Sequence, residues 1–126
     1  VTLRESELNE YTADIIREYA KIGFKIYVSP DNLDFASEFG INANVINYDT
    51  AIKWIKNRDV SSSQKLAIIM NVPVVANNKE NDSFPVRRAA VERGIPVMTC
   101  MDTAKVFLKA IRLKQNNESL EYLELA

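Results

Sequence analysis

Histidine is absent from this sequence of 126 residues, and cysteine occurs once, at Cys100. Without histidine the chain lacks the commonest general base near neutral pH, the commonest zinc ligand and the imidazole of a serine or cysteine triad. A single cysteine cannot form an internal disulfide, and we expect Cys100 to be a small buried apolar group. Acid–base chemistry would therefore have to come from Asp, Glu, Lys or Cys100.

Strong net charge and long apolar runs are also missing. The 16 basic and 17 acidic residues nearly cancel, so the chain lacks the cationic surface that nucleic acid requires. No apolar run approaches the roughly 20 residues that cross a bilayer. We therefore expect no nucleic-acid partner, no membrane partner and a reducing, cytoplasmic setting. The start at Val1, without an initiator Met, is the start expected of an excised fragment or a processed chain.

What is present indicates one folded domain. The chain is 47% hydrophobic and 26% charged, which is typical of a globular protein. It is long enough for one core and too short for two ordinary domains. No internal repeat or interdomain linker interrupts it, so the sequence predicts a single domain over 1–126.

Helix and strand patterns alternate along the whole chain. The predicted strands are 1–3, 24–28, 41–46, 66–70 and 97–98, and the predicted helices cover 8–22, 30–39, 51–55, 84–93 and a long stretch that Thr99 caps. Leu120, Tyr122, Leu123 and Leu125 favour a closing edge strand or a docked tail. The alternation predicts an α/β fold, a single Rossmann-like three-layer domain with a five-stranded parallel sheet, helices on both faces and a C-terminal edge strand.

Polar residues follow three of the predicted strands. Ligands collect at the carboxyl ends of parallel strands, where the following helices offer free N–H groups. The segments that would converge there are 29–33, 71–73 and Thr99. Two of their side chains also have a structural interpretation, because Ser29 can simply cap a helix and Asn71 can satisfy backbone groups at a strand end. The sequence predicts a pocket at this edge of the sheet.

Two neighbouring arginines, Arg87 and Arg88, invite an anion-site interpretation. Adjacent residues on a helix point about 100° apart, so both cannot face one pocket. We favour a structural or interdomain ion pair for one of them, with the anion contact as the alternative.

The run from Phe84 to Thr99, FPVRRAAVERGIPVMT, carries a family resemblance. It resembles the "Y-x-I-R-R-x-A-V-x-x-x-I-P-x-x-T" pattern, followed by an "A-K" helix, of the methylglyoxal-synthase-like domain at the C-terminus of the carbamoyl-phosphate synthase large subunit. The matching residues are Val86, Arg87, Arg88, Ala90, Val91, Ile95, Pro96, Thr99, Ala104 and Lys105. The resemblance extends from about Thr2 to Leu125.

The resemblance implies an effector site. Ser29 and Asn32 align with the two hydroxyl residues of the family's phosphate loop, "A-T-x-G-T-A", and Asn71 aligns with the asparagine after the fourth strand. Together with Thr99, these residues are the expected effector-binding set. The resemblance implies no catalytic residue, no metal and no cofactor in this domain.

The phosphate loop departs from the family's pattern. Pro30 removes one N–H donor, and Asp31 places a negative charge in the first helical turn, where it competes with an incoming anion. Leu8 and Asn9 stand where the family often has a phosphate-binding lysine, and Tyr48 stands where a second basic contact is expected. The site is therefore poorly equipped for a nucleotide phosphate.

Three functions follow from these observations. The resemblance implies a non-catalytic regulatory domain that binds UMP, IMP or ornithine and acts on the synthetase domains of the same chain, a ligase that makes carbamoyl phosphate from bicarbonate, glutamine-derived ammonia and ATP for pyrimidine or arginine synthesis. The second interpretation is a module whose effector site has decayed and whose role is packing or homo-oligomerisation. The third is a methylglyoxal synthase, but the Asp base in a glycine-rich context, the His electrophile and the intact phosphate loop of that family are all missing.

Overall fold

The computed structural model describes the backbone of residues 1–57, 66–72 and 84–125, and their side chains up to residue 116. Five short strands alternate with helices, as the sequence predicts. The strands are β1 Thr2–Leu3, β2 Ile26–Val28, β3 Ala43–Val45, β4 Ile69–Val72 and β5 Val97–Met98. The helices are α1 Glu10–Lys21, α2 Leu33–Glu38, α3 Tyr48–Lys56, α4 Phe84–Glu92 and α5 Met101–Leu125, with 3-10 turns η1 Glu5–Glu7 and η2 Pro30–Asn32.

The strands form a three-stranded and a two-stranded parallel sheet that meet at Val1. The first sheet has the order β1-β4-β5, and β2 pairs with β3 in the second. The amine of Val1 donates to the Tyr27 carbonyl (2.7 Å), and the Ser29 N–H donates to the Val1 carbonyl (3.0 Å). These two bonds place the five strands in the order β3-β2-β1-β4-β5, so the predicted five-stranded sheet is present as two joined sheets.

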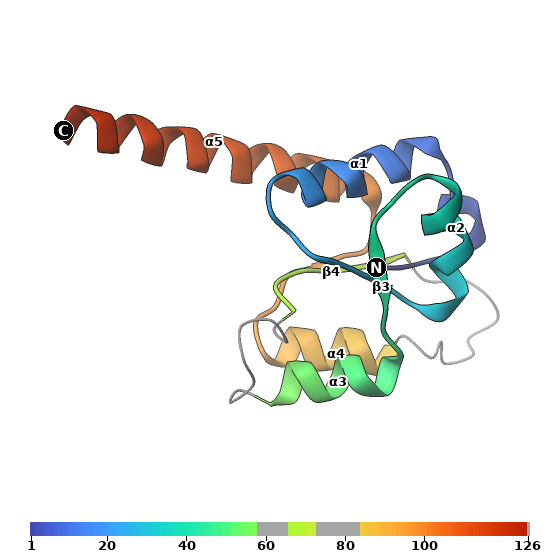
Figure 1. The fold of residues 1–126 in the computed structure, drawn as a ribbon. Helices are drawn as coiled ribbons and strands as arrows, with labels where there is room; N and C mark the ends of the chain where they lie inside the picture. Colours follow the sequence, from blue (N-terminus) through green and yellow to red (C-terminus); the bar gives the residue numbers. More distant parts are fainter. Residues whose placement is uncertain (58–65, 73–83, 126) are drawn as a thin grey trace.

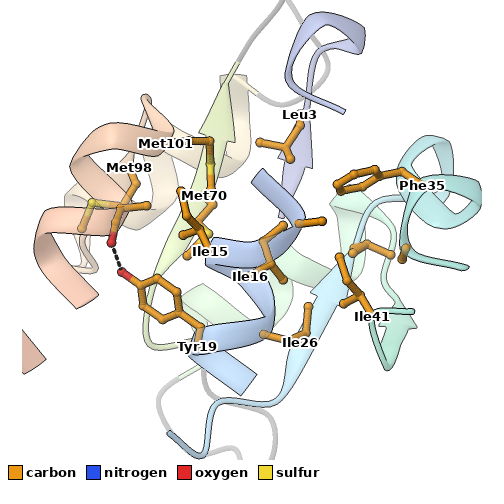
Figure 2. Close-up of a cluster of buried hydrophobic side chains, with 14 of the residues drawn as sticks. Leu3, Ile15, Ile16, Tyr19, Ile26, Phe35, Ile41, Met70, Met98 and Met101 are labelled. Atoms are coloured by element: carbon orange, nitrogen blue, oxygen red, sulfur yellow. Dashed lines mark hydrogen bonds between the residues drawn. The ribbon is translucent and has the colours of Figure 1, made fainter. Parts of the chain in front are cut away.

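Two clusters of buried side chains cover opposite faces of the strands. The α1, α2 and α5 side holds the larger cluster (Figures 1 and 2), and the α3 and α4 side holds the smaller one. Strand residues alternate between them, because successive side chains in a strand point to opposite faces: Met70 belongs to the first cluster and Ile69 to the second. This arrangement confirms the predicted three layers.

Local signals set several helix ends. Asn9 caps α1 by accepting from the Thr12 N–H (3.0 Å), and Asn47 caps α3 by accepting from the Thr50 N–H (2.8 Å). Gly94 follows α4 with a φ of 73°, the left-handed conformation that glycine adopts without strain. The predicted stop of this helix at Gly94 is confirmed.

The C-terminal segment is helical, so the predicted edge strand over 120–125 is wrong. Helix α5 runs for 25 residues to Leu125 and extends beyond the other elements (Figure 1). The segment after Leu113 contains three Glu and three Leu, which favour helix, and neither Gly nor Pro to end one. This local preference for helix outweighs the weak apolar alternation of residues 120–125.

The start of α5 also differs from the prediction. The first intrahelical bond runs from the Ala104 N–H to the Cys100 carbonyl (3.2 Å), so Cys100 rather than Thr99 holds the N-cap position. Cys100 is exposed there, and the expectation that it is buried is wrong. No helix in the described ranges is both long and apolar enough to cross a membrane.

Candidate functional site

Ser29, Thr2 and Asn71 form a row across three neighbouring strands, which we call the polar row. Val1 bonds to Tyr27 through its amine and to Ser29 through its carbonyl, so it lies opposite Val28, the residue between them. The next residue of β1, Thr2, therefore lies opposite Ser29. On its other side Thr2 pairs with Asn71 of β4. Because adjacent strands lie about 4.8 Å apart, the Ser29 and Asn71 backbones are separated by about 10 Å. The structure therefore brings these two predicted site residues together, on either side of β1.

The polar row faces α3 and α4. Its neighbours Leu3 and Val72 belong to the cluster on the opposite face, so alternation turns Thr2 and Asn71 away from that cluster. The Thr2 hydroxyl lies 2.9 Å from the hydroxyl of Tyr48, the first residue of α3. Tyr48 thus covers the middle of the row.

Two oxygens of the row are buried without a protein partner in the part of the chain that the structure describes. They are Ser29 Oγ and Asn71 Oδ1. Ser29 is 3% exposed and Asn71 is 1% exposed. Ser29 precedes η2 but its side chain makes no capping bond, so capping does not account for this hydroxyl. Buried polar atoms are nearly always hydrogen-bonded, so both oxygens are open to a further donor.

A cleft of about 290 Å³ lies between β2 and β4, and Ser29, Thr2 and Tyr48 line it. We call it the β2–β4 cleft. Its other lining residues are mostly apolar, with Lys25 as the one formal side-chain charge among those described. Asn71 lies next to the cleft through Thr2 but is not part of its lining.

Asn32 is close to the row but its side chain is already committed. Its Oδ1 accepts from the Leu3 N–H (2.7 Å), and its Nδ2 donates to the Leu3 carbonyl (3.1 Å). The side chain is 1% exposed. Asn32 therefore joins η2 to the end of β1, a connection between residues 29 positions apart that local sequence patterns do not reveal.

Replacing Asn32 with alanine is expected to lower the free energy of unfolding by about 2–3 kcal/mol, because two buried backbone groups of Leu3 lose their partners. Urea unfolding of wild type and variant measures the loss. Asn42→Ala is the control, because Asn42 is exposed, and its effect is expected within about 0.5 kcal/mol. Equal losses in the two variants would contradict this role of Asn32.

Thr99 lies at a different hollow, on the α1 and α5 side of the carboxyl edge. This hollow has a volume of about 210 Å³ and is lined by Arg4, Glu7, Tyr11, Val72, Thr99, Cys100, Met101 and Asp102. The Tyr11 hydroxyl donates to the Asp102 carboxylate. That hydrogen bond, together with partial desolvation and the nearby negative charge, raises the pKa of Tyr11 above its usual value. The four predicted effector residues are thus divided between two places.

The two arginines of α4 line the same hollow, so the expectation that both cannot face one pocket is wrong, although their side chains have different partners. Arg88 pairs with Glu92 (3.3 Å) on the same helix, and both side chains are exposed. The Arg87 guanidinium lies 5.5 Å from the centre of the Phe84 ring. A shallow hollow on the outer side of α4 is lined by Phe84, Arg87, Arg88, Val91 and Glu92.

Sequence reasoning missed the part that Thr2 plays in the site. Thr2 lies near the end of β1 and faces the side opposite Leu3. That position can be recognised as part of the site only once the pairing of Thr2 with Asn71 is known. The row itself is uncharged. Within the described ranges, no group of three or more Cys, Asp or Glu side chains is placed to hold a metal ion.

Comparisons with known proteins give one relationship. No family model matches the chain. The carbamoyl phosphate synthase large chain of Clostridium acetobutylicum is 33% identical over 122 residues, that of Thermoanaerobacter sp. is 30% identical over 125, and that of Clostridium perfringens strain SM101 is 26% identical over 129. These matches cover 97–99% of this chain but only 11% of each relative's length. The chain is therefore a homologue of a short segment of the carbamoyl phosphate synthase large chain, which confirms the family resemblance seen between Val86 and Lys105.

Proposed function

We propose that this chain is a non-catalytic, effector-binding regulatory domain of a carbamoyl phosphate synthase large chain. The polar row carries the proposal, because it presents, at the carboxyl end of parallel strands, two buried oxygens that have no partner among the described residues. The synthesis of carbamoyl phosphate from bicarbonate, ammonia and ATP belongs in this proposal to other parts of the longer protein.

The chemistry of the polar row favours a ligand that donates hydrogen bonds. Asn71 Oδ1 is an acceptor, and the Ser29 hydroxyl both accepts and donates. The amino groups of ornithine or the ribose and base N–H and O–H groups of UMP and IMP supply such donors. A phosphate finds no cation within the row, and Asp31 stands in the following turn. Ornithine fits these groups best.

Regulation requires the effector to bind two states of the longer protein with different affinities, typically with a coupling of about 1–3 kcal/mol. The outer side of α4 is the surface that we propose contacts the synthetase domains. There Phe84 is 45% exposed and Val91 is 68% exposed, beside the guanidinium of Arg87. Apolar residues flanked by arginine are typical of interface cores.

A second candidate is a structural or oligomerisation module without an effector. It is favoured by Asn32, whose amide is used by Leu3 and is not free for a ligand. It is also favoured by the exposed apolar residues Val91 on α4 and Val106 and Leu113 on α5. Copies of the chain could associate through these residues.

Ornithine, UMP, IMP and inorganic phosphate, each at millimolar concentration, test the proposal in thermal melts. A ligand at ten times its Kd adds about 1.4 kcal/mol of stability, which corresponds to a rise of roughly 4–6 °C for a domain of this size. The rise is expected with ornithine, and Asn71→Leu is expected to abolish it. Asn44→Leu, an exposed site on β3, is the matched control and should keep it.

Two outcomes would contradict the proposal. The absence of a shift with all four compounds, together with a concentration-dependent dimer in sedimentation, would favour the structural module. Formation of methylglyoxal from dihydroxyacetone phosphate above background would show that the domain is catalytic.

A further inference from the structure

Helix α5 has apolar residues on two opposite sides. On one side Ala104 and Leu108 are buried in the larger cluster. On the other side Val106 is 67% exposed and Leu113 is 63% exposed, with the exposed Ala110 between them. With 3.6 residues per turn, these three positions fall along one side of the helix. The core accounts for the first side, whereas the second has no partner in the part of the chain that the structure describes.

The exposed side follows the spacing of a coiled coil. Val106, Ala110 and Leu113 are separated by four and then three positions, and the sequence continues this spacing with Asn117 and Leu120. We call these five positions the outer stripe. Apolar residues spaced alternately by three and four positions are typical of a helix that packs along another helix, and a single Asn within such a stripe is common.

The second half of α5 leaves room for another helix. The helix has 25 residues and is therefore about 37 Å long. Its first half lies along α1, to which it is joined by the ion pair between Arg112 and Glu18. Figure 1 shows its second half extending away from the other described elements. A partner helix can therefore follow the outer stripe over its whole length.

The charges of α5 are divided between its two halves. Residues 103–117 contain basic residues and no acidic one, and residues 115–125 contain acidic residues and no basic one. The basic residues are Lys105, Lys109, Arg112 and Lys114, and the acidic residues are Glu118, Glu121 and Glu124. The helix is therefore positive along its first half and negative along its second.

This division decides which partner suits the outer stripe and in which direction. In an antiparallel pair of α5 helices, the basic half of each lies beside the acidic half of the other. In a parallel pair like charges would meet, which is unfavourable. An antiparallel pair also has two-fold symmetry, so each favourable contact occurs twice and the association closes at two copies.

We propose that two copies of this chain associate through antiparallel pairing of their α5 helices. The outer stripe forms the apolar centre of the interface, and the basic and acidic halves flank it with complementary charges. The partner that covers the exposed residues of α5 is therefore a second copy of the chain. This inference does not rest on effector binding at the polar row, and the pair forms with or without a ligand, so either can fail without the other.

Sedimentation equilibrium of the 126-residue chain tests the association. Wild type is expected to change from monomer to dimer between roughly 1 and 200 μM. Leu113→Glu places a charge in the centre of the outer stripe and is expected to raise the dimer Kd at least about tenfold. Val91→Glu is the matched control, because Val91 is equally exposed but lies on α4, and it should leave Kd unchanged. A wild-type chain that stays monomeric, or equal effects of the two variants, would overturn the proposal.

Reversal of the charges tests the antiparallel direction. Lys109→Glu/Lys114→Glu makes the basic half acidic, and Glu118→Lys/Glu121→Lys makes the acidic half basic. Each double variant is expected to raise Kd about tenfold, and the combined fourfold variant to restore it to within about threefold of wild type. Lys105 and Arg112 are left unchanged, because Lys105 lies over the Tyr11 ring and Arg112 pairs with Glu18.

Two further variants make the result of the charge reversal decisive. Lys53→Glu/Lys56→Glu makes the same charge change at exposed positions of α3 and is expected to keep the wild-type Kd. Lys109→Gln/Lys114→Gln removes charge without adding repulsion and is expected to raise Kd about threefold, which serves if a reversed variant fails to fold by circular dichroism. In a parallel pair, like charges meet before and after each reversal, so an unchanged Kd in both reversed double variants would overturn the antiparallel pairing.

Discussion

Tyr19→Ala is expected to lower the free energy of unfolding by about 3–5 kcal/mol, the usual cost of truncating a large aromatic residue in a core. Tyr19 is 1% exposed and lies in the larger cluster, where Figure 2 shows it among side chains from several elements. Its hydroxyl donates to the Ala104 carbonyl of α5 (2.6 Å), and its ring meets Phe24 edge-on at 5.5 Å between centroids. The substitution therefore removes both packing and the link between α1 and α5.

Tyr19→Phe separates these two contributions, because it keeps the ring and removes the hydroxyl. Its cost is expected to be about 1–2 kcal/mol, since the buried hydrogen bond from α1 to the Ala104 carbonyl is lost. Tyr11→Ala serves as the control on the same helix, because Tyr11 is 44% exposed. Urea unfolding measures all three variants. A loss at Tyr19→Ala no larger than that at Tyr11→Ala would contradict the central position of Tyr19 in the core.

The 126-residue chain is expected to lose about 3 kcal/mol of stability as the pH falls from 8 to 5. The amine of Val1 has a pKa of 8.0 when exposed and about 5 in the folded chain. Below pH 8 the unfolded chain therefore binds a proton that the folded chain excludes until about pH 5, and each pH unit in this window favours unfolding by up to about 1.4 kcal/mol. Stability is greatest above pH 8 and levels off below pH 5.

Denaturant titrations at pH 8, 7, 6 and 5 measure this dependence. Histidine, the side chain that normally titrates in this window, is absent from the sequence. The Glu18 carboxylate accepts hydrogen bonds from Lys21 and Arg112, which lower its pKa from the usual 4.5. Its titration therefore lies below the range from pH 8 to pH 5. The matched control is the N-terminally acetylated chain, which is expected to show a nearly flat profile. A similar slope in both forms would exclude Val1 as the source.

The order of the elements could be predicted from sequence because local rules place each of them. The apolar stripe that includes Ile15 and Tyr19 marks α1, and both side chains are buried as that stripe requires. Gly94 ends α4, and Ile69 and Met70 begin a buried strand. The C-terminal segment was misjudged because its apolar residues fit a strand pattern weakly while its polar residues favour helix.

The site could be predicted only in part because it depends on register and on contacts between distant residues. Ser29 and Asn71 were recognised from their places at strand ends, and both lie in the polar row. The use of Asn32 by Leu3 could not be read from any local pattern. Thr99 was assigned to the same pocket because all parallel strands end at one edge, but side-chain alternation and the position of α5 place it at a separate hollow.

The ladder between β1 and β2 combines two kinds of amide. At Val1 the partners are backbone groups, whereas at Leu3 the partner is the primary amide of Asn32, which imitates a peptide unit with one acceptor and one donor. Backbone pairing tolerates almost any side chain. The pairing through the Asn32 side chain does not tolerate substitution. Aspartate would offer no donor to the Leu3 carbonyl, and the glutamine side chain is one methylene too long. Mutational tolerance along this seam should therefore change abruptly over two residues, being broad beside Val1 and restricted to a single amino acid at position 32.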